Sequence, residues 1–402
     1  MKILQVNCVY KNGSTGKIVY DIHTELKKKG IESIICYGRG KQVLDSGVYK
    51  VTSTFEAKLN SLYSRICGIM YGGAFFATSK LISIIKKEKP DVVHLQCVNC
   101  YILNIYKIVT FLKKKNIKTV VTLHAEFMYT ANCAHAYECE KWKSGCGRCP
   151  DLKRKTRSFF LDRTDVSWMK MKRAFDGFQN IDIVSVSPWL KERATESPIL
   201  ADFKHHVIHN GLDPSIFCAR EILHLREKHQ LHQNEKVIFH VTPSFDNNPF
   251  NLKGGIHLIE LAKRLIGENV RIIVAGGYPE GLAVPDNITL LGEIKDQQLL
   301  AEYYNLADVT VITSKRETFS MVCAESFCCG TPVVGFLSGG PESISLKDYS
   351  SFVKYGDIDA LETAVRKMIF SSDAMDKQQI IQQARIYSKH QMVNKYIEIY
   401  NE

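Results

Sequence analysis

The stretch SKRETFSMVCAESFCCGTPVV, residues 314–334, decides the fold. It follows the apolar run 309–312, which is typical of a buried strand, and from Phe319 onward its residues favour a helix. The backbone N–H groups that open this helix, helped by its dipole, would form an anion-binding turn. Glu317 and Glu325, with seven residues between them, would offer carboxylates to the hydroxyl groups of a ligand.

The rest of the chain repeats the alternation of strands and helices. Apolar runs in the first half predict strands at residues 2–9, 31–37, 91–96, 119–123 and 181–185. In the second half the predicted strands are 207–209, 237–241, 271–275, 288–290, 309–312 and 332–336. This βαβ rhythm predicts the α/β class with two doubly wound, Rossmann-like domains. Ligands of such sheets bind beyond the carboxyl ends of the strands, so we expect the domains to face a central cleft.

The domain boundary is predicted near residues 200–212, where a strand runs into a turn at Asn210-Gly211. We therefore expect an N-terminal domain, 1–205, with a cysteine-rich insertion at about 130–150. A C-terminal domain, 206–375, follows it. The last segment, 376–402, is predicted to be a helix that crosses back to the N-terminal domain.

The composition excludes several classes of protein. With 402 residues, 45% hydrophobic and 24% charged, the chain is of the soluble globular type, neither disordered nor collagen-like. It contains no apolar run of 18 residues and no signal-peptide pattern, so we expect a cytoplasmic protein. The nearest apolar stretch, 66–79, favours a core helix, and its alternative is a surface that dips into a membrane.

Charge is distributed unevenly along the chain. Residues 1–200 contain 33 basic and 17 acidic side chains, whereas residues 201–402 contain 20 and 25. A basic half could face phosphates, nucleic acid or anionic lipid. We expect no nucleic-acid partner, because no stripe of interleaved aromatic and basic residues occurs.

Several residues at predicted strand ends suit a ligand. Gly13 and Gly16 lie in the loop after the first strand, where glycines let the backbone approach a diphosphate, although a plain strand-to-helix turn is an equal alternative. Lys253 precedes a helix, so its ammonium group could stand at the same diphosphate. Gly276 directly follows the predicted strand 271–275. His124 directly follows the strand 119–123 on the cleft side, although a lone histidine is more often a satisfied core or loop group.

At these residues the sequence resembles a known family over nearly its whole length. The Glu317-x7-Glu325 spacing, the GTPVVGF run at 330–336, the NGLD turn at 210–213 and the TLH at 122–124 resemble retaining glycosyltransferases of the GT-B fold, family 4. The resemblance implies a hexosyltransferase whose N-terminal domain binds the acceptor and whose C-terminal domain binds a nucleotide-sugar donor.

The resemblance also implies roles for the residues of the 314–334 stretch. Glu325 would bind the donor ribose and Glu317 the donor sugar. Backbone amides of Thr318, Phe319 and Ser320 would hold sugar and phosphate oxygens.

Further roles follow from the same resemblance. His124 and Lys253 would complete a catalytic set with Glu317, while Gly13, Gly16 and Gly276 would line the donor site. In the family the loop of Gly13 and Gly16 abuts the donor phosphates or the acceptor, and Gly276 lies where the nucleotide base is held. In the family an arginine shortly before the lysine also grips the diphosphate, but residues 241–252 contain no arginine. Arg316 is the candidate replacement. No cofactor is expected for catalysis.

Four of the 13 cysteines form a cluster. They are Cys133, Cys139, Cys146 and Cys149, in a segment that resembles an insertion of some bacterial polysaccharide glycosyltransferases. Thiolates at this spacing could hold a structural Zn(II). Reduced buried thiols are the main alternative, and a redox-active or disulfide role is the third.

The sequence therefore predicts a retaining glycosyltransferase of cell-surface polysaccharide biosynthesis, that is, of capsule, exopolysaccharide or O-antigen. Its donor would be a UDP-sugar rather than a GDP-sugar, and its acceptor a glycan or lipid-linked sugar at the inner membrane surface. The alternatives are a catalytically weak or silent protein that binds sugar nucleotides, and a nucleotide-sugar epimerase.

Overall fold

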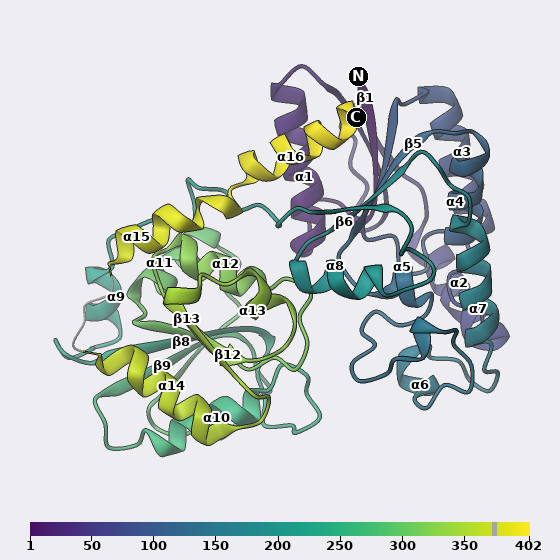
Figure 1. Cartoon of the computed structure of the whole chain (residues 1–402). Helices are drawn as coiled ribbons and strands as arrows, with labels where there is room; N and C mark the ends of the chain where they lie inside the picture. Colours follow the sequence, from purple (N-terminus) through teal and green to yellow (C-terminus); the bar gives the residue numbers. More distant parts are fainter. Residues whose placement is uncertain (372–375) are drawn as a thin grey trace. The chain divides into compact units, whose positions relative to one another are not determined.

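The computed structural model describes residues 1–371 and 376–402, and its contacts divide the chain into two compact units (Figure 1). Unit 1 comprises Met1–His209 and Met392–Glu402, and unit 2 comprises Asn210–Gln391. Each unit contains one sheet whose strands all pair in parallel. The predicted α/β class with two doubly wound sheets is confirmed.

The sheet of unit 1 has seven strands in the order β3-β2-β1-β4-β5-β6-β7. The strands are β1 Lys2–Val9, β2 Glu32–Arg39, β3 Val48–Lys50, β4 Val92–Leu95, β5 Lys118–Leu123, β6 Ile181–Ser185 and β7 Lys204–Val207. The helices are α1 Gly13–Lys28, α2 Thr54–Cys67, α3 Phe75–Glu88, α4 Ile105–Lys114, α5 Phe127–Thr130, α6 Leu152–Lys155, α7 Thr164–Phe175, α8 Pro188–Thr195 and α16 Lys389–Asn401, with a short 3₁₀ turn at Lys141–Lys143.

Helices α1 and α16 pack on the sheet of unit 1 because each has an apolar stripe at helical spacing. In α1 this stripe is Ile18, Ile22 and Leu26, which joins a core cluster with Ile3 of β1. In α16 the stripe includes Met392, Val393, Tyr396, Ile399 and Tyr400. The last helix of the chain thus lies beside α1 (Figure 1).

Polar contacts fix α16 in this position. The imidazole of His94 on β4 bonds Tyr400 Oη at 2.7 Å and Thr122 Oγ1 at 2.7 Å. Tyr396 Oη lies 2.9 Å from the same threonine hydroxyl. All four side chains are buried, and burial lowers the pKa of His94 to about 3, so its ring is neutral.

The sheet of unit 2 has six strands in the order β10-β9-β8-β11-β12-β13. The strands are β8 Lys236–Ser244, β9 Val270–Gly277, β10 Ile288–Gly292, β11 Val309–Ile312, β12 Val333–Phe336 and β13 Ser350–Val353. The helices are α9 Leu223–Lys228, α10 Gly255–Arg264, α11 Gln297–Leu306, α12 Met321–Cys328, α13 Gly340–Ile344, α14 Ile358–Phe370 and α15 Lys377–Gln383, with 3₁₀ turns at Lys347–Tyr349 and Ala384–Tyr387. Apolar residues of α10 and α14 form one core with β8, β9 and β11.

Four segments differ from the sequence predictions, the first being the strand predicted at 207–209, which lies earlier, at Lys204–Val207. Residues 66–79 do not form one core helix, because Gly68 adopts a left-handed conformation that ends α2, and α3 begins only at Phe75. Residues 376–402 form α15, a 3₁₀ turn and α16 rather than one helix. Gly13 and Gly16, which were predicted to lie in a loop, form the first turn of α1 instead.

Among the described residues, no helix combines the length and the apolar character that crossing a membrane requires.

Candidate active site

The strand order of unit 2 determines where a ligand can bind. From β8 the chain passes outward to β9 and β10, and from β11 it passes in the opposite direction to β12 and β13. The carboxyl ends of β8 and β11 are therefore the topological switch point, where diverging loops leave a crevice. The loops that follow these two strands contain Lys253 and Glu317, two of the predicted catalytic residues.

Lys253 and Glu317 form an ion pair at this switch point. Lys253 Nζ lies 2.5 Å from Glu317 Oε1, although 64 positions separate the two residues along the chain. The side chains are 34% and 23% exposed, so a ligand can reach both. An ammonium group is a phosphate binder and a carboxylate accepts hydrogen bonds from hydroxyls, so the pair suits an anionic ligand that also contains hydroxyls.

Close backbone packing holds the loops of this site together. Gly254 has a φ of +70°, and a Cβ atom there would collide with the carbonyl oxygen of Thr313. Thr313 Oγ1 donates to the carbonyl oxygen of Lys253 at 2.8 Å. A Cβ atom on Gly340 would lie only 2.5 Å from the backbone nitrogen of Phe319. Glycine is required at both places, and the resulting contacts keep the loops in one conformation.

Thr318, Phe319 and Ser320 form the turn between β11 and α12. All three residues are buried. Ser320 has a φ of +79°, which is a strained conformation for a residue with a side chain. Its Oγ accepts a hydrogen bond from the backbone nitrogen of Cys323 at 3.3 Å and so caps α12. The predicted anion-binding turn thus coincides with a capped helix start.

Glu325 lies inside α12 and has a partner that the sequence analysis did not identify. Tyr304 Oη, on α11, donates a hydrogen bond to Glu325 Oε2 at 2.8 Å. Burial, and then the Glu325 carboxylate, raise the pKa of Tyr304 well above its ordinary value, so the hydroxyl keeps its proton. Tyr304 therefore orients the carboxylate that we predicted to bind a ribose.

Gly276 lies near the end of β9, beside the loop that leaves β8. A Cβ atom there would collide with the carbonyl oxygen of Thr242 on β8. The two strands thus approach each other at a point where only glycine fits. The predicted site residues described so far all belong to unit 2: Lys253, Gly276, Glu317, the turn at 318–320 and Glu325.

The other predicted site residues belong to unit 1. Its strand order also reverses between β1 and β4, so the carboxyl ends of these strands form a second switch point. Gly13 opens α1 there with a φ of +65°. A Cβ atom on Gly16 would lie 3.1 Å from Val9 Cγ2, so this helix start is closely packed against β1.

His124 follows β5 and belongs to a neutral hydrogen-bond network. Its Nε2 lies 3.2 Å from Gln96 Oε1, and Gln96 Nε2 donates to Gln5 Oε1 at 2.8 Å. Burial lowers the pKa of His124 to about 4, so the imidazole is neutral at pH 7. A neutral ring beside amide groups can exchange hydrogen bonds with a hydroxyl, but it offers no charge to a phosphate.

Glu126, two residues after His124, anchors the cysteine-rich insertion and was not identified from the sequence. Its carboxylate is fully buried, accepts a hydrogen bond from the backbone nitrogen of Ala136 at 2.7 Å, and lies 3.5 Å from Arg193 Nη2. A buried carboxylate that pairs with an arginine is costly to disrupt, so this contact determines how the insertion leaves the sheet. An acidic residue after an apolar strand was the available sequence signal.

The four clustered cysteines are reduced and lie close together, but not as close as a closed metal site requires. Burial and then the neighbouring thiols raise the pKa of Cys133 to about 12 and that of Cys146 to about 11. Sulfur atoms around a tetrahedral Zn(II) are separated by about 3.8 Å. Within residues 1–371 and 376–402, one group of three side chains has possible ligand atoms that all lie within 4.8 Å of one another. This group contains no cysteine. As placed, no three of the four sulfur atoms lie within 4.8 Å of one another.

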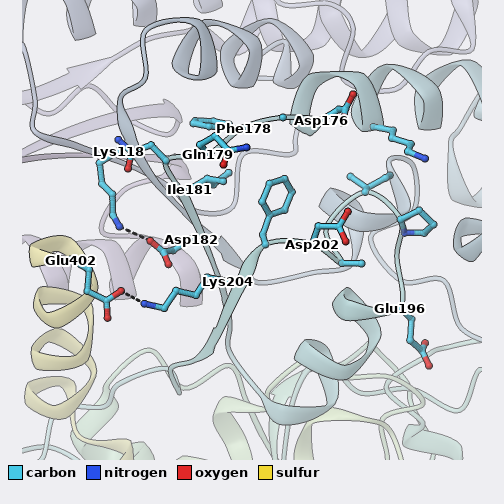
Figure 2. Close-up of a pocket in the computed structure, with 17 residues that line it drawn as sticks. Lys118, Asp176, Phe178, Gln179, Ile181, Asp182, Glu196, Asp202, Lys204 and Glu402 are labelled. Atoms are coloured by element: carbon cyan, nitrogen blue, oxygen red, sulfur yellow. Dashed lines mark hydrogen bonds and ion pairs between the residues drawn. The ribbon is translucent and has the colours of Figure 1, made fainter.

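That group is Asp182, His206 and Glu402. Asp182 and Glu402 also line a pocket of about 990 Å³ in unit 1 (Figure 2). Asp182 accepts from Lys118 Nζ at 2.6 Å and lies 2.9 Å from His206 Nε2, while Glu402 pairs with Lys204. Lysines already neutralise both carboxylates. The pocket lies where β5, β6 and β7 begin, opposite the switch point, so we interpret the group as an ion-pair network that attaches the end of α16 to the sheet.

Two doubly wound parallel sheets with a charged, glycine-packed turn at one switch point define a class of protein, the GT-B glycosyltransferases. A family sequence model described as Glycosyltransferase Family 4 matches residues 15–216, half of the chain, and one described as Glycosyl transferases group 1 matches residues 224–386. The chain therefore belongs to glycosyltransferase family 4, and it is a glycosyltransferase.

Two curated relatives match most or all of the chain. The putative colanic acid biosynthesis glycosyl transferase WcaC of Escherichia coli K12 is 23% identical, and the alignment covers 100% of this chain and 99% of that protein. N-acetyl-alpha-D-glucosaminyl L-malate synthase of Bacillus anthracis is 21% identical over 79% of each chain.

Solved structures show the same fold. Sucrose-phosphate synthase of Thermosynechococcus elongatus has a TM-score of 0.71 at 15% identity and covers 100% of this chain and 98% of its own. Anabaena Alr3699/HepE in complex with UDP has a TM-score of 0.65 at 15% identity and covers 99% of both chains.

Proposed function

We propose that this glycosyltransferase moves a hexose, with retention of configuration, from a nucleotide-sugar donor to a glycan or lipid-linked acceptor in cell-surface polysaccharide biosynthesis. The observation that carries the proposal is the Lys253–Glu317 pair at the switch point of unit 2. A cation and a carboxylate there match the two chemical features of a nucleotide sugar, its diphosphate and its hydroxyls.

We assign the donor to unit 2, residue by residue. Lys253 binds the diphosphate and Glu317 accepts hydrogen bonds from the sugar, so donor binding separates the ion pair that they form without a ligand. The backbone of the 318–320 turn and the start of α12 face the phosphate oxygens. Glu325, oriented by Tyr304, accepts from the ribose hydroxyls.

Arg316 supplies the second cation at the diphosphate in this proposal. It stands next to Glu317 on the loop that follows β11, whereas the family's arginine would precede Lys253. A guanidinium group on the opposite loop can approach the same phosphates from the other side of the switch point. Gly276 lets the donor base approach the end of β9.

We assign the acceptor to unit 1. The neutral amide and imidazole groups around His124 suit hydroxyls that accept and donate hydrogen bonds. Gly13 and Gly16, in the first turn of α1, allow a ligand to approach the backbone closely. His124 contacts the sugar near the reaction centre in this assignment.

The transfer step then depends on electrostatics. As the bond from the sugar to the diphosphate breaks, negative charge develops on the leaving phosphate, and Lys253, Arg316 and the α12 dipole stabilise it. The acceptor hydroxyl attacks from the face that the diphosphate leaves, its proton passes to the departing phosphate, and the configuration is retained. This chemistry needs no cofactor.

The biological setting rests on the relatives. WcaC is named for colanic acid biosynthesis, and Anabaena Alr3699/HepE, a neighbour of the same fold, was solved with UDP and with UDP-glucose. We therefore favour a UDP-sugar donor and an enzyme of the cytoplasm that attaches peripherally to the inner membrane surface.

A donor screen tests the proposal directly. Thermal unfolding is measured with UDP-, GDP-, ADP- and dTDP-sugars, in the wild type and in Glu325→Ala. We expect one nucleotide class to stabilise the wild type by about 2.7 kcal/mol at a hundredfold excess over its Kd, and the variant to lose this effect. Stabilisation by no sugar nucleotide would refute the donor assignment.

Two further assays separate the alternative functions. Radiolabelled donor incubated with a membrane lipid extract should yield labelled lipid, whereas binding without transfer would identify a silent sugar-nucleotide-binding protein. That alternative is favoured by the absence of arginine from residues 241–252. Conversion of the donor sugar without any acceptor would identify an epimerase.

We retain structural zinc at the cysteine cluster as a proposal that rests on four thiols and the Cys146-x-x-Cys149 spacing. Zinc binding would have to draw the sulfur atoms together. Elemental analysis should give about one zinc per chain, and Cys146→Ser should lose it. A metal-free wild type purified without chelator would establish the cluster as reduced thiols.

A further inference from the structure

An apolar stripe on α2 faces solvent. The side chains of Phe55, Leu59, Leu62, Tyr63 and Ile66 are between 44% and 71% exposed. Their positions are four, seven, eight and eleven residues after the first, which places them on one side of the helix. The opposite side of α2 packs on the protein through Ala57 and Ser64. α2 therefore packs on the protein through one side and exposes an apolar stripe on the other. Apolar side chains gathered on an exposed face usually mark an interaction site.

The stripe continues onto two neighbouring segments. The rings of Tyr63 and Phe75 are in edge contact with their centroids 6.0 Å apart, and Phe76 beside them is 84% exposed. Near the same C-terminal end of α2, the backbone nitrogen of Phe159 donates to the carbonyl oxygen of Arg65 at 2.9 Å. Phe160, the next residue, is 90% exposed. One continuous apolar surface therefore runs from the first turn of α3 across α2 to the 159–161 loop.

Basic side chains border this apolar surface. Lys58, Lys80, Arg157 and Arg163 are exposed around it, and the Arg65 guanidinium lies 4.3 Å from the centroid of the Phe159 ring.

The acids in the same segments already accept hydrogen bonds from the protein. Glu56 accepts from the backbone nitrogen of Ala77 at 2.9 Å, and Asp162 accepts from Thr164 Oγ1 at 2.7 Å. The border of the surface is therefore positively charged.

The surface adjoins the edge of unit 1 that we assign to the acceptor. Asn60 Nδ2 on α2 donates to the carbonyl oxygen of Tyr101 at 3.2 Å, and Tyr101 lies in the loop that leaves the carboxyl end of β4. A molecule held against α2 thus lies next to the switch point of this unit.

We propose that α2, the first turn of α3 and the 159–161 loop together bind the surface of an anionic phospholipid bilayer. Aromatic and aliphatic side chains would enter the region between headgroups and acyl chains, and the basic border would pair with lipid phosphates. A bilayer matches the combination of exposed aromatic rings and a one-signed charged rim. The inference deepens the proposed function, because it names the surface through which a lipid-linked acceptor would be reached.

Vesicle sedimentation tests the inference. The full-length protein is mixed with vesicles of phosphatidylcholine alone or with about one third phosphatidylglycerol. We expect strong binding to the anionic vesicles only. Ile66→Ser/Phe76→Ser should lower the partition coefficient about a hundredfold, or about tenfold for each apolar side chain withdrawn. Lys58→Glu should lower it about fivefold or more, and salt should weaken binding.

Two controls match these variants. Leu44→Ser in unit 1 and Ile266→Ser in unit 2 remove side chains that are 91% and 61% exposed outside the surface, and neither should change vesicle binding. Donor-induced thermal stabilisation should be the same in all variants, so failure of the donor assignment and failure of this inference give different results.

Unchanged vesicle binding by Ile66→Ser/Phe76→Ser would overturn the inference. A second result would also overturn it: the wild type does not bind vesicles, and changing these two residues converts a dimer into a monomer. The surface would then bind a second copy of the chain.

Discussion

The switch points of the two units share one topology but differ in chemistry. In unit 2 the loops after β8 and β11 bring Lys253 and Glu317 into an ion pair. In unit 1 the corresponding region near β1 and β4 contains the neutral groups of Gln5, Gln96 and His124. The fold supplies the crevice in both cases, and the side chains determine what it can bind. In the proposed division of roles, unit 2 supplies charge for a diphosphate and unit 1 supplies neutral hydrogen bonds for hydroxyls.

The largest expected effect is on the rate of sugar transfer, when the cation of the Lys253–Glu317 pair in unit 2 is removed. Lys253→Ala should lower kcat/KM about a hundredfold or more, because a preorganised cation is lost from the leaving phosphate. The measurement is the initial rate of sugar transfer at low donor concentration. Lys315→Ala is the matched control, since Lys315 lies on the β11 loop with its Nζ over the Tyr355 ring, and its rate should change less than about threefold. Equal losses in the two variants would contradict the assignment.

Glu325 and Tyr304 provide a graded test within unit 2. Glu325→Gln should weaken donor binding about thirtyfold, because hydrogen bonds to a charged acceptor contribute about 1.5–3 kcal/mol. Tyr304→Phe should weaken it about fivefold, since it only loosens the orientation of the carboxylate. Calorimetric titration measures both affinities. A Tyr304→Phe effect as large as that of Glu325→Gln would mean that the tyrosine contacts the donor itself.

Unit 1 should lose stability in acid, because it contains the buried, neutral His94. The pKa of His94 is about 3 in the folded chain and ordinarily about 6.5, so the unfolded chain gains its proton first as the pH falls. The stability that this histidine contributes is complete above pH 6.5 and is lost between pH 6.5 and about 3. At pH 5 the loss is about 2 kcal/mol.

Urea unfolding at pH 7.5 and pH 5 measures this loss. His94→Gln should be less stable than the wild type at pH 7.5, but its further loss on acidification should be smaller by the same amount. An identical pH response in the two proteins would show that His94 does not gain its proton on unfolding.

The smallest expected effect concerns His124. His124→Asn should lower kcat/KM about tenfold, the amount that one hydrogen bond to the reacting sugar contributes. Donor affinity should stay the same, because we assign His124 to the acceptor side. If donor affinity falls as much as the rate, then the division of roles between the two units is wrong.

Sequence patterns predicted the central strands well because these strands are buried on both faces. Strands β1, β4, β5 and β6 read as continuous apolar runs, and each was predicted within two residues at either end. The edge strands β3 and β13 were missed. Each has three or four residues, and most of them are only partly buried, so no apolar run marks them.

The candidate site was only partly predictable for a similar reason. Lys253 and Glu317 were each singled out by position, but their pairing depends on the strand order that places β8 beside β11. Tyr304 resembles any core aromatic residue in the sequence. Its role appears only when α11 packs against α12 and its hydroxyl meets Glu325.

The return of α16 to the first sheet has a practical consequence for dissecting the enzyme. A fragment that stops at residue 209 would contain every strand of unit 1 but would lack the helix that shields part of its apolar surface. It would also leave His94 without the phenol of Tyr400. A stable acceptor half should therefore require a fused tail, with residues 392–402 joined by a linker to residue 209, whereas the simple truncation should aggregate.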